Sequence, residues 1–329
     1  MKLATLPNGT RDGALHVVTK ALTMAVNAAP VARTLQGALD EWHHVEHKLR
    51  ELAQSLEAGT LRDAFPFDPA TAMAPLPRAY TFLDGSAYLN HVELVRKARG
   101  ADMPPSFYTD PLMYQGCSDT FLAPHAPIAH ASEEQGIDFE SEIVVILGDV
   151  PQATTAAQAA PHVKLIGLVN DVTLRNLVPN ELAKQFGFLV SKPNSALSPV
   201  FVTPDELGTA WRDGKLHLPL TTWLNNEKFG DPDGAQEMHF SFHQLIAHAA
   251  QTRPLCAGSI LGAGTASMKD RSRGSSCLAE KRTIEKLDTG NPVTPFLKFG
   301  DRVRIEMFNG TENVFGTIDQ VVQKSAGRA

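Results

Sequence analysis

The 329-residue chain is predicted to fold as an α+β protein that is rich in β-strand. Three observations predict this class. Short runs of β-branched and apolar residues far outnumber helical patterns, Asn-Gly and Asp-Gly pairs follow several of these runs, and residues 296–322 hold two or three amphipathic strands. Such pairs supply the positive φ of tight hairpin turns, so most neighbouring strands are expected to be antiparallel.

The composition excludes several classes of protein. Thirty Lys and Arg residues against 36 Asp and Glu residues give a net charge of -6 without a basic cluster, which argues against nucleic acid and anionic membrane as partners. The three cysteines, Cys117, Cys256 and Cys277, are widely separated and odd in number, as is typical of a reducing compartment rather than of a disulfide framework. Neither a signal peptide nor an apolar run of membrane-spanning length is evident, so we expect a cytoplasmic protein.

Residues 1–77 are expected to form a small N-terminal domain, followed by a catalytic domain over 78–329. Two strands, KLATL and LHVVT, flank the turn NGTRDG, and Gly59 is placed to end one helix over 33–58. The Pro-rich stretch 65–79 is predicted to connect the two domains. The helix is predicted from an apolar stripe at three-and-four spacing: Leu35, Leu39, Trp42, Val45, Leu49, Leu52 and Leu56.

The next segment, 80–100, is predicted to start as a strand and to turn at Asp84-Gly85-Ser86. A short helix or an ordered lid then carries His91. Asp84 is compatible with simple turn chemistry, and His91 with an ordinary surface or core histidine. Residues 101–135, which contain several Pro and Gly, are expected to form a long loop of the kind that often carries function.

Residues 136–148, GIDFESEIVVILG, have the sequence of a buried strand that carries two carboxylates. At a period of two, Glu140 and Glu142 lie on the same face, about 7 Å apart, where two ionised carboxylates repel unless a proton or a cation separates them. Oxygen ligands of this kind favour Mg²⁺, Ca²⁺ or Mn²⁺ over zinc. The alternative is an edge strand with both glutamates in solvent, but the apolar run VVIL indicates that both faces are covered.

The remaining pattern adds further acidic and basic candidates. KLIGLVND is predicted to be a strand that ends at Asp171, Arg175 precedes a short helix, and Lys192 lies in a Ser-Lys-Pro turn. Asp171 is also a candidate helix N-cap. LNNEKFGD is expected to be a hairpin tip, FSFHQLIAHAAQ a helix, and 255–267 a Gly-rich loop that allows close backbone approach to a ligand. Glu280 lies in the segment SSCLAEKRTIEKL.

These acids and their neighbours form a set of spaced motifs that resembles the fumarylacetoacetate hydrolase family over about residues 78–325. The E-x-E motif with a downstream ND-x3-R is the specific part, and the glycine motif alone is not. The resemblance implies a mixed β-sandwich or roll, and the N-terminal unit looks like the extra domain of some bacterial members. The matching motifs are D-x6-H at Asp84 and His91, E-x-E at Glu140 and Glu142, ND-x3-R at Asn170, Asp171 and Arg175, SKP at Lys192, and G-x-GT at Gly262 to Thr265.

The resemblance implies a metal-dependent hydrolase that cleaves a carbon–carbon bond in a 1,3-diketo acid, either fumarylacetoacetate or an acylpyruvate. Such enzymes act in aromatic-compound catabolism, including tyrosine degradation, and the family's main domains pair as homodimers. The implied metal is Mg²⁺, or Ca²⁺ or Mn²⁺, and its implied ligands are Asp84, Glu140, Glu142 and Asp171. The implied catalytic residues are His91, Glu280, Lys192 and Arg175. The implied substrate-binding residues are Arg99, Tyr114, Gly264 and Thr265.

The chain departs from the fumarylacetoacetase branch at positions after the arginine. Val178 and Leu182 stand where that branch tends to carry Gln and Tyr, and PNSAL after Lys192 lacks the usual glycine. The metal site is still expected, but the substrate is left open. Relatives on this fold also decarboxylate oxaloacetate, hydrate dienoates or isomerise homoprotocatechuate-pathway intermediates. A further alternative is a non-catalytic binder of metal and dicarboxylate, although the presence of His91 and Glu280 argues against it.

Overall fold

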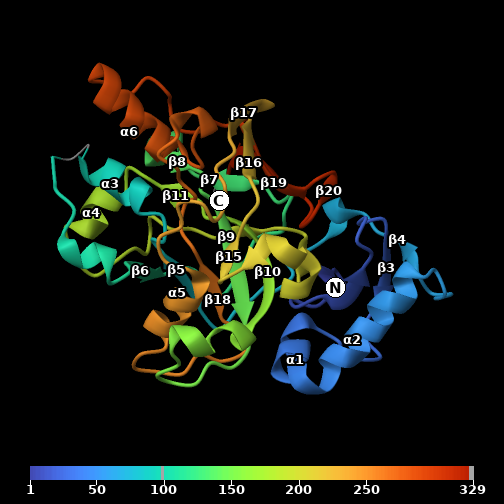
Figure 1. Ribbon diagram of the computed structural model, residues 1–329. Coiled ribbons are helices and arrows are strands. Elements are labelled where there is room, and N and C mark those ends of the chain that lie inside the picture. Colours follow the sequence, from blue (N-terminus) through green and yellow to red (C-terminus); the bar gives the residue numbers. More distant parts are fainter. Residues whose placement is uncertain (98–99, 326–329) are drawn as a thin grey trace.

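The computed structural model of the protein describes residues 1–97 and 100–325. Two large sheets form the centre of the molecule, and helices lie at its periphery (Figure 1). The α-helices are α1 (Leu35–Asp40), α2 (Trp42–Glu57), α3 (Leu89–Lys97), α4 (Val178–Leu182), α5 (Phe242–Ala249) and α6 (Leu278–Thr289). The short 3-10 helices are η1 (Pro69–Thr71), η2 (Pro105–Tyr108), η3 (Glu133–Gln135), η4 (Ala156–Gln158), η5 (Ala160–His162), η6 (Pro204–Ala210) and η7 (Arg271–Arg273).

The larger sheet has eleven strands in the described residues, and all neighbours are antiparallel except β18 and β5. In spatial order the strands are β4 (Phe65–Pro66), β3 (Met24–Asn27), β2 (Ala14–Val18), β1 (Lys2–Leu6), β13 (Val200–Val202), β10 (Val163–Asn170), β9 (Ser141–Leu147), β18 (Ile260–Gly262), β5 (Phe82–Gly85) and β6 (Met113–Gln115), with β12 (Ala196–Leu197) paired to β10. This β-rich α+β architecture confirms the predicted fold class.

A second sheet carries the carboxyl-terminal strands. Its members are β17 (Glu227–Gly230), β16 (Leu220–Leu224), β19 (Arg302–Asn309), β21 (Ile318–Lys324) and β7 (Ile128–His130), with β20 (Glu312–Asn313) paired to β19. Two strand pairs complete the fold: β8 (Ile137–Asp138) with β11 (Thr173–Leu174), and β14 (Trp211–Arg212) with β15 (Lys215–Leu216). Asn225 and Asn226 adopt positive φ at the tip between β16 and β17, where the hairpin was predicted.

The core lies on both faces of β9, and the alternation of its side chains explains why. Ile143 and Val145 pack into one buried cluster, while Val144 and Ile146 pack into the other. A strand covered on both faces has no solvent-facing side on which to place charge. Glu142, with no exposed surface, is therefore enclosed by protein. The alternative interpretation, an edge strand that exposes this glutamate to solvent, is excluded.

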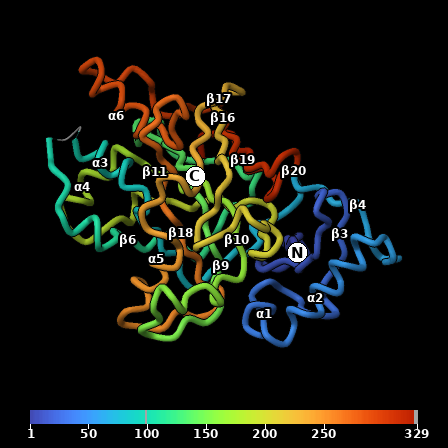
Figure 2. The backbone as a smooth tube through the Cα atoms, in the orientation of Figure 1, coloured from blue at the N-terminus to red at the C-terminus, as the bar shows by residue number. Residues whose placement is uncertain are grey.

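The N-terminal strands extend the large sheet, because β1 pairs with β13 in antiparallel register from Lys2 opposite Val202. The blue N-terminal segment, with α1 and α2, lies at one side of the molecule in Figure 2. The single helix expected over 33–58 is divided at Glu41, whose backbone is not helical. Leu39 and Trp42 are buried on either side of this break. The apolar stripe therefore continues across the break and does not indicate where it lies.

The Gly-rich segment 255–267 differs from its prediction, because part of it is not a loop. Residues Ile260–Gly262 form β18, which lies between β9 and β5 in the middle of the large sheet. A side chain on Gly262 would collide with the carboxylate of Asp84. The glycine therefore makes room for Asp84 next to β9. Within the described part of the chain, we find no helix that is both long and apolar enough to cross a membrane.

Candidate metal centre and active site

Three carboxylates from separate parts of the chain meet inside the large sheet. Asp84 lies on β5, Glu142 on β9, and Asp171 directly after β10. Each offers an oxygen, and these three oxygens lie within 4.8 Å of one another. The residues are 7%, 0% and 1% exposed, so solvent does not screen their mutual repulsion. The arrangement gathers negative charge at a point that little solvent reaches.

The electrostatics of this group fit a hard divalent cation. Burial, followed by the charge of Asp171, raises the pKa of Asp84 to about 7. Burial, followed by the charges of Asp84 and Asp171, raises the pKa of Glu142 well above its ordinary value. Oε2 of Glu142 is buried and has no hydrogen-bond partner among the described residues. A divalent cation with oxygen ligands, such as Mg²⁺, Ca²⁺ or Mn²⁺, would satisfy that atom and neutralise the group.

Glu140 lies beside the three carboxylates but is bound differently. Its Oε1 accepts from Nζ of Lys192 at 2.7 Å, and its Oε2 accepts from the hydroxyl of Thr265. The same hydroxyl reaches Oε1 of Glu142 at 3.4 Å, so the two glutamates share a face as the strand period predicted. Burial alone would raise the pKa of Glu140, but the charges of Arg175 and Lys192 hold it below its ordinary value. Its place as a fourth metal ligand stays a prediction.

Lys192 is the main cation next to the acidic group. Its side chain is 8% exposed, and its Nζ donates to both Glu140 and Asp171. Burial would lower the pKa of Lys192, but the charges of Asp171 and Glu140 outweigh burial and raise that pKa. Tyr114 also donates its hydroxyl to Asp171, and Ser195 donates to the other oxygen of Asp171 at 2.6 Å. Asp171 is therefore fixed on both of its oxygens.

His91 and Glu280 form a pair at the edge of the same site. Nδ1 of His91, on α3, lies 2.8 Å from Oε2 of Glu280, on α6. Glu280 is 1% exposed, and its Oε1 is buried without a hydrogen-bond partner among the described residues. Since Nδ1 is engaged by a carboxylate, Nε2 is the ring nitrogen left to take up a proton. The histidine and glutamate that lie 189 positions apart in the chain are thus joined in space.

Asp138 explains how Glu280 is placed, and sequence reasoning did not single it out. Its two oxygens accept from the backbone amides of Leu278 and Ala279 at 2.8 and 2.9 Å, at the start of α6. Nε of Arg175 donates to the same carboxylate at 2.8 Å. A negatively charged side chain at a helix N-terminus is favourable, because the free backbone amides there carry partial positive charge. The available signal was an acid two positions before Glu140, which a period of two places on the same face as Glu140 and Glu142.

The other predicted site residues lie around the same group. The backbone amide of Gly264 donates to Asp84 at 2.9 Å, and Gly264 has φ +79, with no room for a side chain beside Gly85. Thr265 bridges the two glutamates as described above. Thr173, which was not predicted, donates its hydroxyl to Glu140. Arg99, a predicted substrate-binding residue, lies outside the described residues.

A cavity opens from the acidic group towards the surface. Its inner part has a volume of about 130 Å³ and is lined by residues that include Asp84, His91, Tyr114, Arg175 and Lys192. At roughly 30 Å³ for each water, this part holds about four water molecules, or the head of a small acid. It shares several lining residues with an outer cavity of about 730 Å³. Three of the predicted catalytic residues, His91, Arg175 and Lys192, therefore face a space that a small organic acid can enter.

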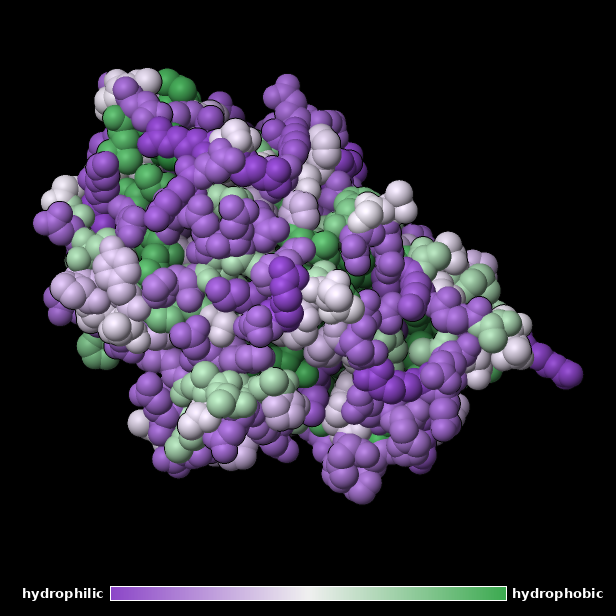
Figure 3. Space-filling model, in the orientation of Figure 1, coloured by the Kyte–Doolittle hydropathy of each residue, from purple (hydrophilic) through white to green (hydrophobic). Residues whose placement is uncertain are grey.

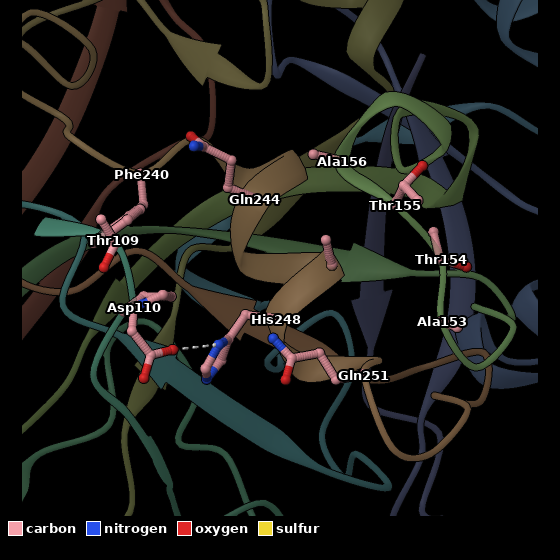
Figure 4. A pocket seen from close by; sticks show the side chains of 12 residues that line it. Thr109, Asp110, Ala153, Thr154, Thr155, Ala156, Phe240, Gln244, His248 and Gln251 are labelled. Atoms are coloured by element: carbon pink, nitrogen blue, oxygen red, sulfur yellow. Dashed lines mark ion pairs between the residues drawn. The ribbon is translucent and has the colours of Figure 1, made fainter. Parts of the chain in front are cut away.

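A separate surface groove of about 460 Å³ lies along α5 and shares no lining residue with this cavity. Figure 4 shows the side chains of His248 and Asp110 pointing toward one another within it, as an ion pair at 3.2 Å. Asp110 is 68% exposed on its side chain, which is typical of a weak surface pair. None of the described residues that line this groove is a buried acid, so the chemistry is assigned to the cavity lined by Asp84, His91 and Lys192.

Comparison with known proteins agrees with this geometry. The family model described as "Fumarylacetoacetate (FAA) hydrolase C-terminal" matches residues 81–323, which hold all the residues of the site. A second model, "Fumarylacetoacetase N-terminal domain 2", matches residues 1–78. Among curated proteins, oxaloacetate tautomerase YisK of Bacillus subtilis is 28% identical over 200 residues, which is 60% of this chain and 61% of that protein. The chain thus covers about three fifths of that relative's length.

Solved structures match over nearly the whole chain. A probable 2-hydroxyhepta-2,4-diene-1,7-dioate isomerase from Mycobacterium abscessus has a TM-score of 0.65 and 17% identity, covering 99% of this chain and 100% of the other. Fumarylacetoacetate hydrolase from Exiguobacterium antarcticum has a TM-score of 0.64 and 16% identity, with the same coverage. At these identities the likeness concerns the fold alone, while the family model spans most of the chain. The protein therefore belongs to the fumarylacetoacetate hydrolase family.

Proposed function

We propose that this protein hydrolyses a carbon–carbon bond in a 1,3-diketo acid such as an acylpyruvate or fumarylacetoacetate. The observation that carries the proposal is the His91–Glu280 pair, whose Nδ1 and Oε2 atoms lie 2.8 Å apart. His91 lines the same inner cavity as Asp84, the member of the three-carboxylate group that reaches it. Hydrolysis needs both a base for water and a charge that binds the oxygens of the substrate. The two requirements meet here in one cavity.

The three carboxylates, with Glu140 as the predicted fourth, would hold the divalent cation. When bound, that cation supplies positive charge that binds the oxygens of a 2-oxo acid and polarises its carbonyl. Lys192 is kept protonated by Glu140 and Asp171, and it lines the inner cavity together with Arg175. The positively charged side chains of Lys192 and Arg175 would stabilise negative charge that develops on the substrate.

His91 and Glu280 are proposed to move the proton. Nε2 of His91 takes a proton from water while Glu280 stabilises the resulting imidazolium through Nδ1. The water oxygen bonds to the outer carbonyl carbon, and the bond from that carbon to the adjacent methylene breaks. Its electron pair goes to the methylene carbon, as the enolate of the leaving oxo acid, and His91 returns the proton there. The products are a carboxylic acid and an oxo acid, which is a 2-oxo acid for an acylpyruvate and a 3-oxo acid for fumarylacetoacetate.

A second candidate is tautomerisation or isomerisation of a 2-oxo dicarboxylic acid. The observation that favours it is the likeness to oxaloacetate tautomerase YisK, together with a solved isomerase of the same fold. This reaction also needs a base beside a bound 2-oxo acid, but the base moves a proton between carbon and oxygen and no water is consumed. His91 and Glu280 are suitably placed for either role.

The experiment is a substrate panel with the purified chain in Mg²⁺. Acetylpyruvate, fumarylpyruvate and fumarylacetoacetate are monitored for loss of diketone absorbance and for both product acids, and oxaloacetate is monitored for enol-to-keto conversion. The proposal predicts cleavage of at least one diketo acid. Conversion of oxaloacetate without any cleavage would select the second candidate, and binding without turnover would select a non-catalytic binder.

A further inference from the structure

The segment between α4 and Lys192 is an exposed connection beside the cavities. Its apolar side chains Phe186, Leu189 and Val190 are exposed, so burial in the core does not hold them. Phe188 nevertheless lines both cavities. Figure 3 shows a mostly polar surface in which apolar side chains gather around α3 and α6, the helices that border the outer cavity. Polar contacts are therefore needed to fix the path of the chain into Lys192.

Glu181, on α4, makes polar contacts of this kind. Its Oε1 accepts from the backbone amides of Leu189 and Val190 at 2.9 and 2.8 Å. Its Oε2 accepts from the backbone amide of Ser191 at 3.1 Å and from the hydroxyl of the same residue. Three successive amides thus converge on one carboxylate, an arrangement in which backbone N–H groups bind an anion. The carboxylate therefore fixes the backbone of residues 189–191.

The charge of Glu181 strengthens these contacts. Burial alone would raise the pKa of Glu181, but the hydrogen bonds from Ser191, Val190 and Leu189 outweigh burial and lower that pKa. Glu181 is therefore ionised at neutral pH, and hydrogen bonds to an ionised acceptor are stronger than those between neutral groups. A glutamine at this position would keep only one acceptor oxygen and would turn its NH2 group toward N–H donors.

Lys192 follows directly after the residue that Glu181 holds most closely. Ser191 is buried, and its carbonyl accepts from a backbone amide of β11 at 2.8 Å. The backbone of Ser191 is therefore fixed on both sides, at its N–H by Glu181 and at its carbonyl by β11. From this point the side chain of Lys192 extends inward and donates to Glu140 and Asp171. A shift of the Ser191 backbone would carry Nζ of Lys192 away from the two carboxylates.

We propose that Glu181 is a positioning residue, which binds the backbone of 189–191 and thereby fixes the ammonium group of Lys192 in the inner cavity. The inference rests on the proposed function, in which Lys192 stabilises negative charge on the substrate. Glu181 lines neither cavity, so it would act on a bound ligand through the segment that it holds. Phe188 belongs to the same segment and lies edge-on against Tyr114, with the ring centres 5.4 Å apart.

The test compares Glu181→Gln with a matched control, Glu285→Gln. Glu285, on α6, makes contacts of the same kind, because it accepts from the backbone amides of Val293 and Thr294 and from the hydroxyl of Thr294. It lines neither cavity. The control therefore removes a similar set of hydrogen bonds without touching the segment that leads into Lys192.

Two measurements are made on each variant. Hydrogen exchange, read by mass spectrometry, reports the protection of the backbone amides in 189–191 and 293–294. Calorimetry in saturating Mg²⁺ reports the affinity for oxalate, a dianion that resembles the enolate of a 2-oxo acid. The affinity is also measured for Lys192→Met and for the double variant Glu181→Gln/Lys192→Met. Binding is read directly, so the result does not depend on which reaction the enzyme catalyses.

Glu181→Gln is expected to speed exchange at 189–191 and to weaken oxalate binding at least about tenfold, as the loss of a charge-assisted contact implies. Glu285→Gln should speed exchange only at 293–294 and should keep the parent affinity. The double variant should bind oxalate no more weakly than Lys192→Met alone, because Glu181 acts through Lys192. Ser191→Ala removes only the hydroxyl contact and should give a smaller loss, and it carries the same comparison should Glu181→Gln not fold.

Unchanged exchange or unchanged oxalate affinity in Glu181→Gln would overturn the inference, as would a further loss in the double variant or failure of the parent to bind oxalate. The predicted affinities without cleavage of any diketo acid would instead reject the hydrolytic proposal alone.

Discussion

Asp138 and Arg175 join the start of α6 to the acidic group: Nε of Arg175 donates to Asp138 at 2.8 Å, and the same carboxylate accepts from two backbone amides of the helix. Nη2 of Arg175 lies 3.3 Å from Oε1 of Glu140. Because Glu280 lies in the first turn of α6, Asp138 fixes the position of the residue that contacts His91. One ion pair thus links the His91–Glu280 pair to the acidic group.

Asp138→Asn is expected to destabilise the fold by about 3 kcal/mol, because it removes one of the two carboxylates that pair with the largely buried Arg175 guanidinium. It should also reduce turnover, since α6 loses the anchor that aligns Glu280. Asp288→Asn is the matched control: it removes an exposed ion pair of the same helix, and it should cost less than about 1 kcal/mol. Urea unfolding of both variants makes the comparison. Equal small losses would mean that Asp138 does not anchor the helix.

Glu142→Gln is expected to abolish stabilisation by Mg²⁺ while keeping the fold. Glu142 supplies one of the three clustered oxygens. At a Mg²⁺ concentration of 100 times its Kd, the bound ion raises the unfolding free energy of the parent by about 2.7 kcal/mol. The metal-free variant should be more stable than the metal-free parent at pH 8, because the repulsion between the carboxylates is reduced. Thermal unfolding with EDTA or Mg²⁺ provides the measurement. Full Mg²⁺ stabilisation of the variant would remove Glu142 from the metal site.

The stability of the metal-free protein is expected to fall as pH rises from about 4 to 8. Folding raises the pKa of Asp84 from 3.8 to about 7 and raises that of Glu142 as well, mainly through burial. A carboxyl whose pKa is higher in the folded than in the unfolded state contributes its full stabilisation below the unfolded-state pKa. That stabilisation is lost as the pH rises through the folded-state pKa.

A bound cation removes the repulsion, so the difference in unfolding free energy between Mg²⁺ and EDTA should widen over the same pH range. Urea unfolding at pH 5, 6, 7 and 8 measures both curves. A metal-free stability that rises steadily between pH 5 and 8 would contradict the assigned electrostatics of the three carboxylates.

Local sequence patterns predicted much of the fold. The period of two in 136–148 placed Glu140 and Glu142 on one face of a covered strand, and the Thr265 hydroxyl that reaches both confirms this. The hairpins at the N-terminus and at Asn225-Asn226 followed from turn residues alone. These features depend on neighbours in the chain, which is why residue spacing was sufficient to predict them.

Features that depend on distant contacts were not predictable in this way. The role of Asp138 depends on Leu278, which lies 140 positions away, and Ser195, which donates to Asp171, lies 24 positions from it. The glycines of 255–267 weaken the strand signal and predict a loop, yet tertiary pairing with β9 and β5 makes Ile260–Gly262 a strand inside the sheet.

We propose that His91, supported by Glu280, activates water beside a bound cation. The most direct measurement is the steady-state cleavage rate of an acylpyruvate by the parent, His91→Ala and Glu280→Gln, together with the Mg²⁺-dependent rise in Tm of each. His91→Ala should lose on the order of 100-fold or more in kcat while keeping the Mg²⁺-dependent rise, and Glu280→Gln should lose less. A His91→Ala enzyme that cleaves the substrate at the parent rate would contradict the account.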